Sequence, residues 1–252
     1  MTPLRRILSP AAIPIFLLVI SLTFLLLIEI GNTHRNRALN NIYFLSIDVA
    51  NVIPDNVPNA VQINDLVHSI GLRDFYKIGL WNYCSGTTEA GITYCSRPQA
   101  SYYFDPVAIV FNAVAAGSSA FATDISAEYR SSLALVRRIS HAIFALFLIS
   151  TIFTFVFCLF APCVPRLSRG VFFAAYIAMG IVALSTLAAS IMATALFTVI
   201  RNVLKGTDNL NIHATVGPAM LAFMWIATAM QLLAFGTFCT LRPRRREGDW
   251  EK

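Results

Sequence analysis

Thirty consecutive residues of this chain carry no charged side chain, from Val171 to Ile200: VFFAAYIAMGIVALSTLAASIMATALFTVI. A helix needs about 20 apolar residues to cross the hydrocarbon core of a bilayer, and this run exceeds that length. Three further runs are long and apolar enough: residues 11–30, 139–161 and 216–241. One such run would fit a buried helix of a soluble protein, but four in 252 residues leave too little polar sequence to enclose a core. The sequence therefore predicts four transmembrane helices.

The overall composition agrees with a lipid environment. Apolar residues make up 57% of the chain and charged residues 13%, whereas soluble domains carry about 25% charged residues. The formal net charge is +6. The basic residues flank the apolar runs instead of covering a soluble face, which indicates a role in membrane topology. Nucleic acid is therefore not expected as a partner.

The first apolar run is interpreted as an uncleaved anchor. Arg5 and Arg6 resemble the basic start of a signal peptide, but the apolar stretch is longer than the usual 7–15 residues or so. The sequence Glu29-Ile30-Gly31 is also a poor cleavage site.

Basic residues next to short loops predict the orientation in the membrane. Three segments on one side of a four-span chain are basic, with Arg5, Arg6, Arg166, Arg169, Arg242, Arg244, Arg245, Arg246 and Lys252. The other side has Arg201 and Lys205 in a short loop, and Arg137 and Arg138 in a long segment. Long segments cross the membrane largely regardless of charge. Both termini are therefore expected in the cytosol, and residues 31–138 outside the cell.

Five cysteines divide between the two sides. Cys84 and Cys95 lie in the long extracellular segment, where a pair can oxidise and stay oxidised. Their disulfide would contribute on the order of 3 kcal/mol of stability. Cys158, Cys163 and Cys239 lie at the predicted cytosolic ends of the second and fourth spans. They are candidates for S-palmitoylation, with small apolar packing residues as the alternative.

The extracellular segment carries local signals for a small β/α domain. Residues 41–49 are predicted to form a strand, residues 78–83 and 91–95 a hairpin closed by the disulfide, and residues 100–104 a further strand. Residues 61–76 are ambiguous, with a short helix as one interpretation. Asp105-Pro106 is a typical helix start, so one or two helices are expected between 107 and 140.

The same segment resembles a known family. The resemblance is carried by residues 42–48 (IYFLSID), by the motif Gly79, Leu80, Trp81, Asn82, Tyr83, Cys84 with Cys95 after it, and by the four spans. Together they are similar to the fungal Sur-seven/PalI family of claudin-like tetraspan plasma-membrane proteins, over about residues 5–246. Animal claudins carry a further tryptophan upstream in the first loop; here the tryptophans are Trp81, Trp225 and Trp250.

The resemblance implies a structural, organising role in eisosome-type cortical domains of the plasma membrane, which support membrane organisation, endocytosis and cell-wall integrity. The expected partners are membrane lipids, other cortical membrane proteins or further copies of the chain, and the cell wall. A PalI-like accessory in ambient-pH signalling is the alternative, although the short tail after the fourth span favours the Sur-seven type. A small channel or transporter is disfavoured, because Glu29 and His141, the ionisable residues of the spans, lie near span ends.

Several residues have candidate structural roles. Trp81 is expected either to pack beside the disulfide or to sit at the membrane interface. Ser185, Ala189 and Ala193 recur at a spacing of four, which lets helices approach closely, within the bundle or between copies. Arg242, Arg244, Arg245 and Arg246 are candidates for contact with anionic lipid headgroups of the cytosolic leaflet, with topological anchoring as the alternative. The thirty-residue third span would measure about 45 Å, so it is expected to project beyond the bilayer on the outer side.

No enzyme is predicted. The histidines show no close metal-ligand spacing, and no phosphate-binding loop or nucleophile motif is present, so no metal and no cofactor is expected. The predicted fold is an α-helical membrane protein, a four-transmembrane-helix bundle with a small disulfide-stapled extracellular β/α domain. Its expected segments are a cytosolic N-terminus (1–10), the first span (11–30), the extracellular domain (31–138), the second span (139–161), a cytosolic loop (162–170), the third span (171–200), an extracellular loop (201–215), the fourth span (216–241) and a cytosolic tail (242–252).

Overall fold

The computed structural model describes residues 12–36, 39–50, 73–100, 102–103, 127–160, 169–205 and 213–240. The chain divides into two compact units, and each is described by itself. The bundle unit comprises Met1–Leu27, Leu146–Ser190 and Phe223–Lys252. The sheet unit comprises Ile28–Ala145 and Ile191–Ala222.

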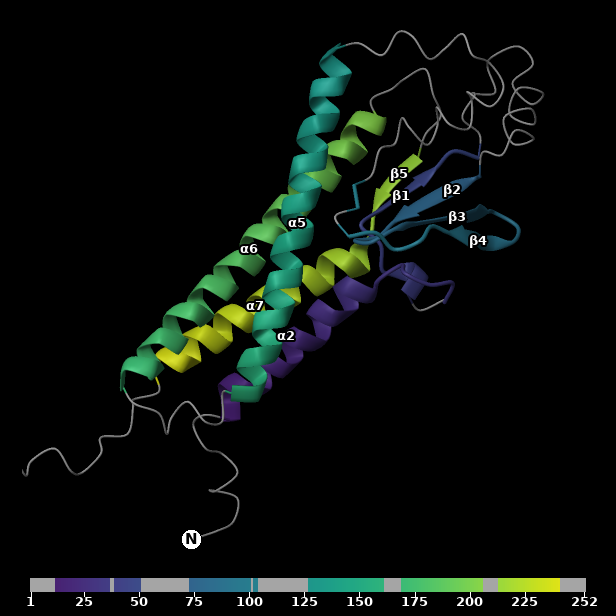
Figure 1. The fold of residues 1–252 in the computed structure, drawn as a ribbon. Coiled ribbons are helices and arrows are strands. Elements are labelled where there is room, and N and C mark those ends of the chain that lie inside the picture. Colours follow the sequence, from purple (N-terminus) through teal and green to yellow (C-terminus); the bar gives the residue numbers. More distant parts are fainter. Residues whose placement is uncertain are drawn as a thin grey trace, which may run out of the picture. The chain divides into compact units, whose positions relative to one another are not determined.

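Four long helices run through these units: α2 (Ala12–Ile30), α5 (Ala127–Phe160), α6 (Arg169–Lys205) and α7 (Pro218–Thr240) (Figure 1). Each is long and apolar enough to cross a membrane. The predicted four-helix membrane protein is thus confirmed. α5 begins at Ala127 and α6 ends at Lys205, so both helices are longer than the predicted spans 139–161 and 171–200.

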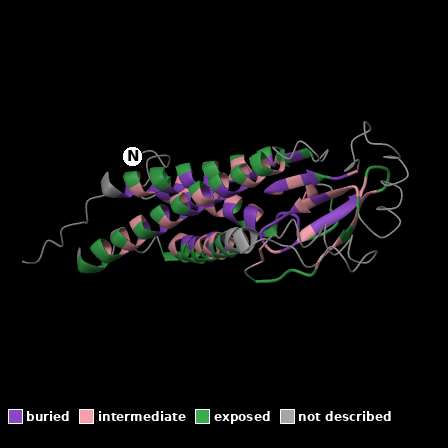
Figure 2. Ribbon diagram, turned by 90° about the horizontal axis from the view of Figure 1, so that it is seen from above, coloured by how far each residue is buried: buried purple, intermediate pink, exposed green. Residues whose placement is uncertain are grey.

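The bundle unit exposes large apolar side chains on its surface and buries hydroxyl groups among the apolar residues of its interior. Its helices carry exposed residues along their length (Figure 2), and these include Phe16, Phe173 and Ile181, each more than 60% exposed. Buried hydroxyls instead bond inside the unit: Ser190 to Thr228 at 3.0 Å, for example. Hydrocarbon offers no hydrogen bonds, so polar groups of a membrane helix find partners within the protein.

An apolar cluster and stacked rings complete the interior of the bundle unit. Leu18, Met179, Ala234 and Phe238 form the buried cluster. The ring of Phe172 stacks on that of Phe238 with 5.7 Å between centroids. These contacts join residues of α2, α6 and α7 within the unit.

The sheet unit is built on five antiparallel strands in the order β4-β3-β2-β1-β5. The strands are β1 (Leu45–Asp48), β2 (Phe75–Ile78), β3 (Tyr83–Thr87), β4 (Gly91–Cys95) and β5 (His213–Val216). β5 comes from the segment between α6 and α7, and it pairs with β1 at the edge of the sheet.

Burial alternates along β1 and β2. Leu45 pairs with Ile78 and Ile47 with Tyr76, and all four side chains are buried. Ala214 of β5 lies opposite Ile47 and continues the buried row. A period of two places these residues on one face of the sheet, which is therefore the core face.

The predicted extracellular elements need corrections. The hairpin joins β3 and β4, so its first strand is 83–87 and the predicted strand 78–83 is wrong. Ile78 ends β2, Tyr83 begins β3, and residues 79–82 between them form a loop. Alternating apolar residues made that loop look extended. The expected strand 100–104 is not formed at Ala100, Tyr102 or Tyr103, the residues of it that the structure describes. The ambiguous stretch 61–76 ends in β2 at Phe75 and Tyr76, and its residues 61–72 lie outside the described residues. Of the stretch 107–140, where one or two helices were expected, residues 127–140 form the first part of α5, and residues 107–126 lie outside the described residues.

Candidate functional site

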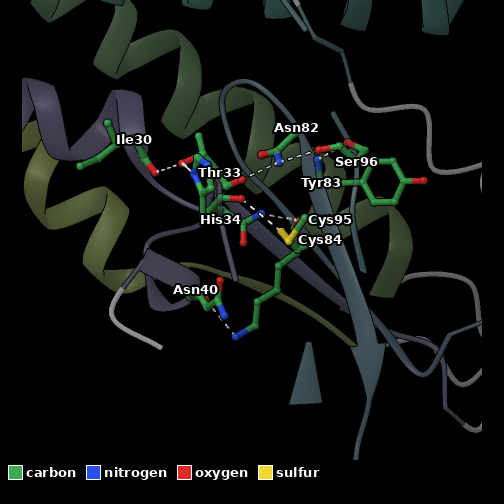
Figure 3. The surroundings of a disulfide bond; sticks show 11 residues. Ile30, Thr33, His34, Asn40, Asn82, Tyr83, Cys84, Cys95 and Ser96 are labelled. Atoms are coloured by element: carbon green, nitrogen blue, oxygen red, sulfur yellow. Dashed lines mark hydrogen bonds between the residues drawn. A yellow bond between two sulfur atoms is a disulfide. The ribbon is translucent and has the colours of Figure 1, made fainter. Parts of the chain in front are cut away.

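The disulfide joins two strands that are direct neighbours. Cys84 of β3 and Cys95 of β4 face each other in the sheet register, and their sulfurs are bonded (Figure 3). The disulfide predicted from the sequence is therefore present. The turn that follows β3 is tied separately, because Asp74 accepts hydrogen bonds from the backbone N–H and the hydroxyl of Thr88 at 2.7 and 3.0 Å. The hairpin is thus held at both ends.

Two buried asparagines connect the disulfide region to the end of α2. The side-chain amide of Asn82 donates to the carbonyl oxygens of Ser96 at 3.1 Å and of Thr33 at 3.4 Å (Figure 3). The side-chain amide of Asn32 donates to the carbonyl oxygen of Lys77 at 2.8 Å. Neither asparagine is exposed. Buried amides that bond to main-chain oxygens fix the path of the loops that they join.

Gly79 lies where two backbone segments come closest. A Cβ atom on Gly79 would lie 3.0 Å from the carbonyl oxygen of Gly31 and 3.1 Å from Cβ of Asn32. The backbone N–H of Gly79 donates to the carbonyl oxygen of Asn82 at 2.8 Å, which closes the turn 79–82. A glycine at the start of the motif therefore has a steric reason.

Trp81 joins the sheet to two helices. Its indole Nε1–H donates to Oε2 of Glu29 at 3.0 Å, near the end of α2. Its ring meets the ring of Phe144, in α5, edge to face with 4.7 Å between centroids. Glu29 is only 8% exposed, so this bond lies in a desolvated place, where it is stronger than in water. These contacts place Trp81 against α2 and α5 within the sheet unit. Packing beside the disulfide and a position at the membrane interface both stay predictions.

The residue just before β1 packs on α6 as well. The ring of Phe44 stacks on that of Phe197 with 4.8 Å between centroids and an interplanar angle of 15°. Leu80, which is buried, borders the same small crevice with Phe44, Phe197 and Ile143. Sheet and helix ends in this unit therefore share one apolar core.

Burial changes the ionisation of three groups in the sheet. Burial raises the pKa of Tyr76, against smaller opposing effects of Arg73. Burial also raises the pKa of Tyr83, with Tyr94 and Tyr76 adding to the effect. It lowers the pKa of Lys77, whose ammonium group lies over the ring of Tyr43. In each case the desolvated charged form is disfavoured.

The other residues singled out from the sequence lie on α5, on α6 and beyond the described residues. Ser185 bonds to Ser150 at 2.8 Å, and Ala189 and Ala193 are fully buried. Their contribution to association between helices stays a prediction. Cys158 is a free thiol of intermediate burial. The side chains of Cys163 and Cys239 and the basic tail Arg242, Arg244, Arg245 and Arg246 lie outside the described residues, so acylation and headgroup contact stay predictions.

Within the described ranges, no three His, Cys, Asp or Glu residues gather into a group that could hold a metal ion. The residues that sequence reasoning missed are Asn32 and Phe144, together with β5. Each of them has its role through a tertiary contact, and no local sequence pattern identified it beforehand. Glu29 was noted only as a charge near a span end, whereas the structure makes it the acceptor for Trp81.

Comparisons with known proteins agree with this arrangement. A family model described as the SUR7/PalI family matches residues 10–236. The chain is 25% identical over 250 residues to the SUR7 family protein pun1 of Schizosaccharomyces pombe, covering 81% of this chain and 84% of that protein. It is 24% identical over 227 residues to the Protein PUN1 of Saccharomyces cerevisiae, covering 85% of this chain and 84% of that protein. The matched range includes the disulfide, the motif 79–82 and all or most of each helix.

Proposed function

Because this chain belongs to the SUR7/PalI family, we propose that it is a structural protein that organises the plasma membrane around it. Its place is an eisosome-type cortical domain, where it supports membrane organisation, endocytosis and cell-wall integrity. The family membership supports the coarser part of this proposal, a multi-pass membrane protein of a fungal family.

One observation carries the proposal: a single small sheet gathers the ends of all four helices. The sheet unit contains the last residues of α2, the first part of α5, the last part of α6 and the first residues of α7. β1 follows α2, and β5 leads directly into α7 through Gly217. A unit in which one sheet connects all four helices is restrained against opening and closing. It is suited to presenting a fixed surface and to packing laterally.

The sheet unit is proposed to lie outside the cell, with both termini in the cytosol. The Cys84–Cys95 bond supports this side, because disulfides persist in oxidising compartments. The basic residues at the other helix ends, such as Arg169 at the start of α6, support it as well. The proposed surface then faces the cell wall.

The test is the lateral mobility of the fluorescently tagged full chain in living fungal cells. The proposal expects static patches at the cell surface, with little recovery after photobleaching over minutes. Cys84→Ser with Cys95→Ser is expected to reduce the number of patches or to raise the mobile fraction, because the hairpin loses its covalent closure. Ala90→Ser is the control, since it changes an exposed turn residue of the same hairpin and keeps both cysteines, and it should leave the patches unchanged.

Rapid and uniform diffusion of the unaltered chain would contradict the organising role. Retention in internal membranes would contradict the plasma-membrane location. A double serine variant that reaches the surface and forms static patches like the unaltered chain would show that the sheet unit is not what holds the protein in place.

A further inference from the structure

An open apolar groove lies between α5 and α6 within the sheet unit. Its volume is about 630 Å³. It is lined by eleven residues, all of them apolar: Leu133, Leu135, Val136, Ile139, Met192, Ala195, Leu196, Val199, Ile200, Val203 and Leu204. Three of these are among the more exposed large apolar side chains of the described chain, Leu135 and Val199 at 59% and Val203 at 68%.

Along both helices, the groove extends past the point where the uncharged run ends and charged residues begin. On α5 the lining residues Val136 and Ile139 lie on either side of Arg137 and Arg138, which precede an uncharged run that extends to Phe160. That run of 22 residues is about 33 Å long, close to the thickness of the hydrocarbon core. The groove therefore continues past the point where hydrocarbon ends.

The same holds for α6. Its lining residues extend from Met192 to Leu204, whereas its first charged residue after the uncharged run is Arg201. Apolar surface beyond the hydrocarbon faces headgroups and water, and this costs about 25 cal/mol for each Å² left uncovered. Extended apolar surface of this kind marks a binding site.

We propose that this groove holds an acyl chain of a phospholipid from the leaflet on the side of the sheet. Among the residues that the structure describes, the lining offers no hydrogen-bonding side chain, so the occupant is expected to be apolar along the groove. Its volume lies within the range of about 300–1,000 Å³ that small-molecule sites have. A chain drawn up from the adjacent leaflet enters the groove without leaving an apolar environment.

Basic side chains beside the groove indicate that the rest of the occupant is a negatively charged headgroup. Four basic residues are direct sequence neighbours of lining residues: Arg137, Arg138, Arg201 and Lys205. Arg137, Arg138 and Lys205 are exposed, and Arg201 is partly exposed. α6 contains no acidic residue from Arg169 to Lys205, and α5 contains none from Leu133 to Phe160. Long basic side chains reach along a helix surface towards headgroups. The phosphate of the lipid is therefore placed beside these cations.

The Arg137 guanidinium is already partly fixed, since it lies over the ring of Tyr103 with 4.9 Å to the centroid. Arg138 and Arg201 are thus the better residues to alter in a test of phosphate contact. The inference extends the proposed function by naming a lipid partner. It is tested on the isolated protein, whereas the organising role is tested in cells, so one can fail without the other.

The experiment uses the full chain in phosphatidylcholine vesicles that contain a small fraction of phosphatidylinositol with a photoreactive group in one acyl chain. After illumination, labelled peptides are identified by mass spectrometry. The label is expected to concentrate in the segments 133–139 and 192–204. Val199→Trp and Ala195→Trp fill the groove and should lower this labelling about fivefold or more, because a displaced methylene is worth about 0.8 kcal/mol.

Leu184→Trp is the matched control, because Leu184 is a 62% exposed apolar residue of α6 outside the groove. It should leave labelling of the groove unchanged. Ala195→Leu fills the groove more gently and covers the case in which a tryptophan variant fails to fold. Folding is judged by elution in detergent and by the presence of the Cys84–Cys95 bond.

The headgroup is tested with Arg138→Gln combined with Arg201→Gln. Labelling by the phosphatidylinositol probe is expected to fall about fivefold for each charge removed. A diacylglycerol probe with the same photoreactive chain, which has no phosphate, should label both proteins equally. Arg138→Lys with Arg201→Lys retains the charges and should retain the labelling.

Two results would overturn the proposal. In the first, label spreads evenly over all exposed apolar faces and the tryptophan variants do not redistribute it, which means that only bulk lipid contacts the groove. In the second, light scattering shows that the groove substitutions convert a dimer into a monomer while lipid labelling is unaffected, which assigns the groove to a second copy of the chain.

Discussion

Buried polar side chains hold the loop 79–82 of the sheet unit by bonds to distant parts of the chain. Asn82 bonds to Ser96 and Thr33, and Trp81 bonds to Glu29, which is 52 residues away in sequence. A net hydrogen bond contributes about 0.5–1.5 kcal/mol, but a buried group that loses its partner costs more. Single substitutions here should therefore have large effects.

Trp81→Phe tests the bond to Glu29. Phenylalanine keeps a ring against Phe144 but has no N–H, so a buried carboxylate loses one donor. We expect the protein to be destabilised by about 1–3 kcal/mol. Thermal unfolding in detergent, followed by circular dichroism, measures the change. Trp225→Phe is the control: Trp225 is 43% exposed on α7, and its replacement should change stability much less. Equal effects of the two substitutions would show that the bond to Glu29 is not important.

Gly86→Ala tests the close approach of the two hairpin strands. A Cβ atom at this position would lie 2.0 Å from the carbonyl oxygen of Gly91, at a register shift between Ser85 and Gly86. The strands must move apart, so we expect a loss of about 1–3 kcal/mol in the same unfolding assay. Gly236→Ala is the matched control, because nothing lies within 4 Å of its added Cβ in α7. There alanine should be neutral, or stabilising by about 0.5–1 kcal/mol.

The ionisation of the buried tyrosines gives a prediction in alkaline solution. Burial raises the pKa of Tyr76 and Tyr83 above 10.0, so the folded protein favours the neutral phenol. The stability that this preference gives is fully present below pH 10 or so and is lost as the pH rises through the raised pKa values. When the folded protein is titrated with base, tyrosinate absorbance should therefore rise in a late step, at a higher pH than for ordinary tyrosines. This late step should be absent in denaturant. Tyr76→Phe should remove part of that step; an unchanged late step would contradict the assignment. Lys77 contributes no signal to this measurement.

At the scale of whole elements, the bundle unit depends on polar contacts between helices. The side-chain amide of Gln231, in α7, donates to the hydroxyl of Thr154, in α5, and both side chains are buried. The hydroxyl of Ser21, in α2, donates to the carbonyl oxygen of Ala227 at 2.9 Å. In hydrocarbon such bonds are worth about 0.6–1.7 kcal/mol each. They fix the register of helices whose outer faces are uniformly apolar.

A double-mutant cycle on Gln231→Leu and Thr154→Val measures one of these bonds. We expect a coupling energy of about 1 kcal/mol between the two sites, because each single change leaves the other polar group without this partner. Reversible unfolding by sodium dodecyl sulfate provides the free energies. Thr237→Val, combined with Thr154→Val, is the control, since Thr237 bonds to Ala234 of its own helix. Strict additivity of the Gln231 and Thr154 changes would contradict the cross-helix bond.

The helices could be predicted from the sequence because their signal is local. A run of about 20 apolar residues is visible without knowledge of the fold, and all four were found. Likewise Cys84 and Cys95 stood out as a pair through their polar, extracellular-type setting. The strand β5 could not be predicted, because His213–Val216 becomes a strand only by pairing with Leu45–Asp48 far away in the sequence. Short strands take their identity from such neighbours.

The difference between local signals and tertiary contacts also explains how much of the candidate site could be predicted. The motif that begins with Gly79 was identified through its resemblance to a family, but its physical reason lies in Gly31, Asn32 and Glu29, which come from a different part of the chain. The predicted strand 78–83 failed for this reason as well. Residues 79–82 do not pair with a neighbouring strand, because the loop turns towards the end of α2 and the middle of α5 and makes its contacts there.

At the scale of the whole molecule, the remaining question is which side of the membrane the sheet occupies. A disulfide within a hairpin whose turn residues Thr88, Glu89 and Ala90 are exposed favours the outside of the cell. The basic residues of the opposite helix ends favour the same orientation. Both arguments are independent of the family.

An epitope inserted between Glu89 and Ala90 tests this orientation, because the exposed turn tolerates an insertion better than the strands do. We expect an antibody to bind intact spheroplasts that carry this epitope. A tag after Lys252 should be reached only once the membrane is permeabilised. An epitope at the turn that needs permeabilisation would place the disulfide in the reducing cytosol. The Cys84–Cys95 bond would then be hard to maintain, and the proposed contact of the sheet unit with the cell wall would be impossible.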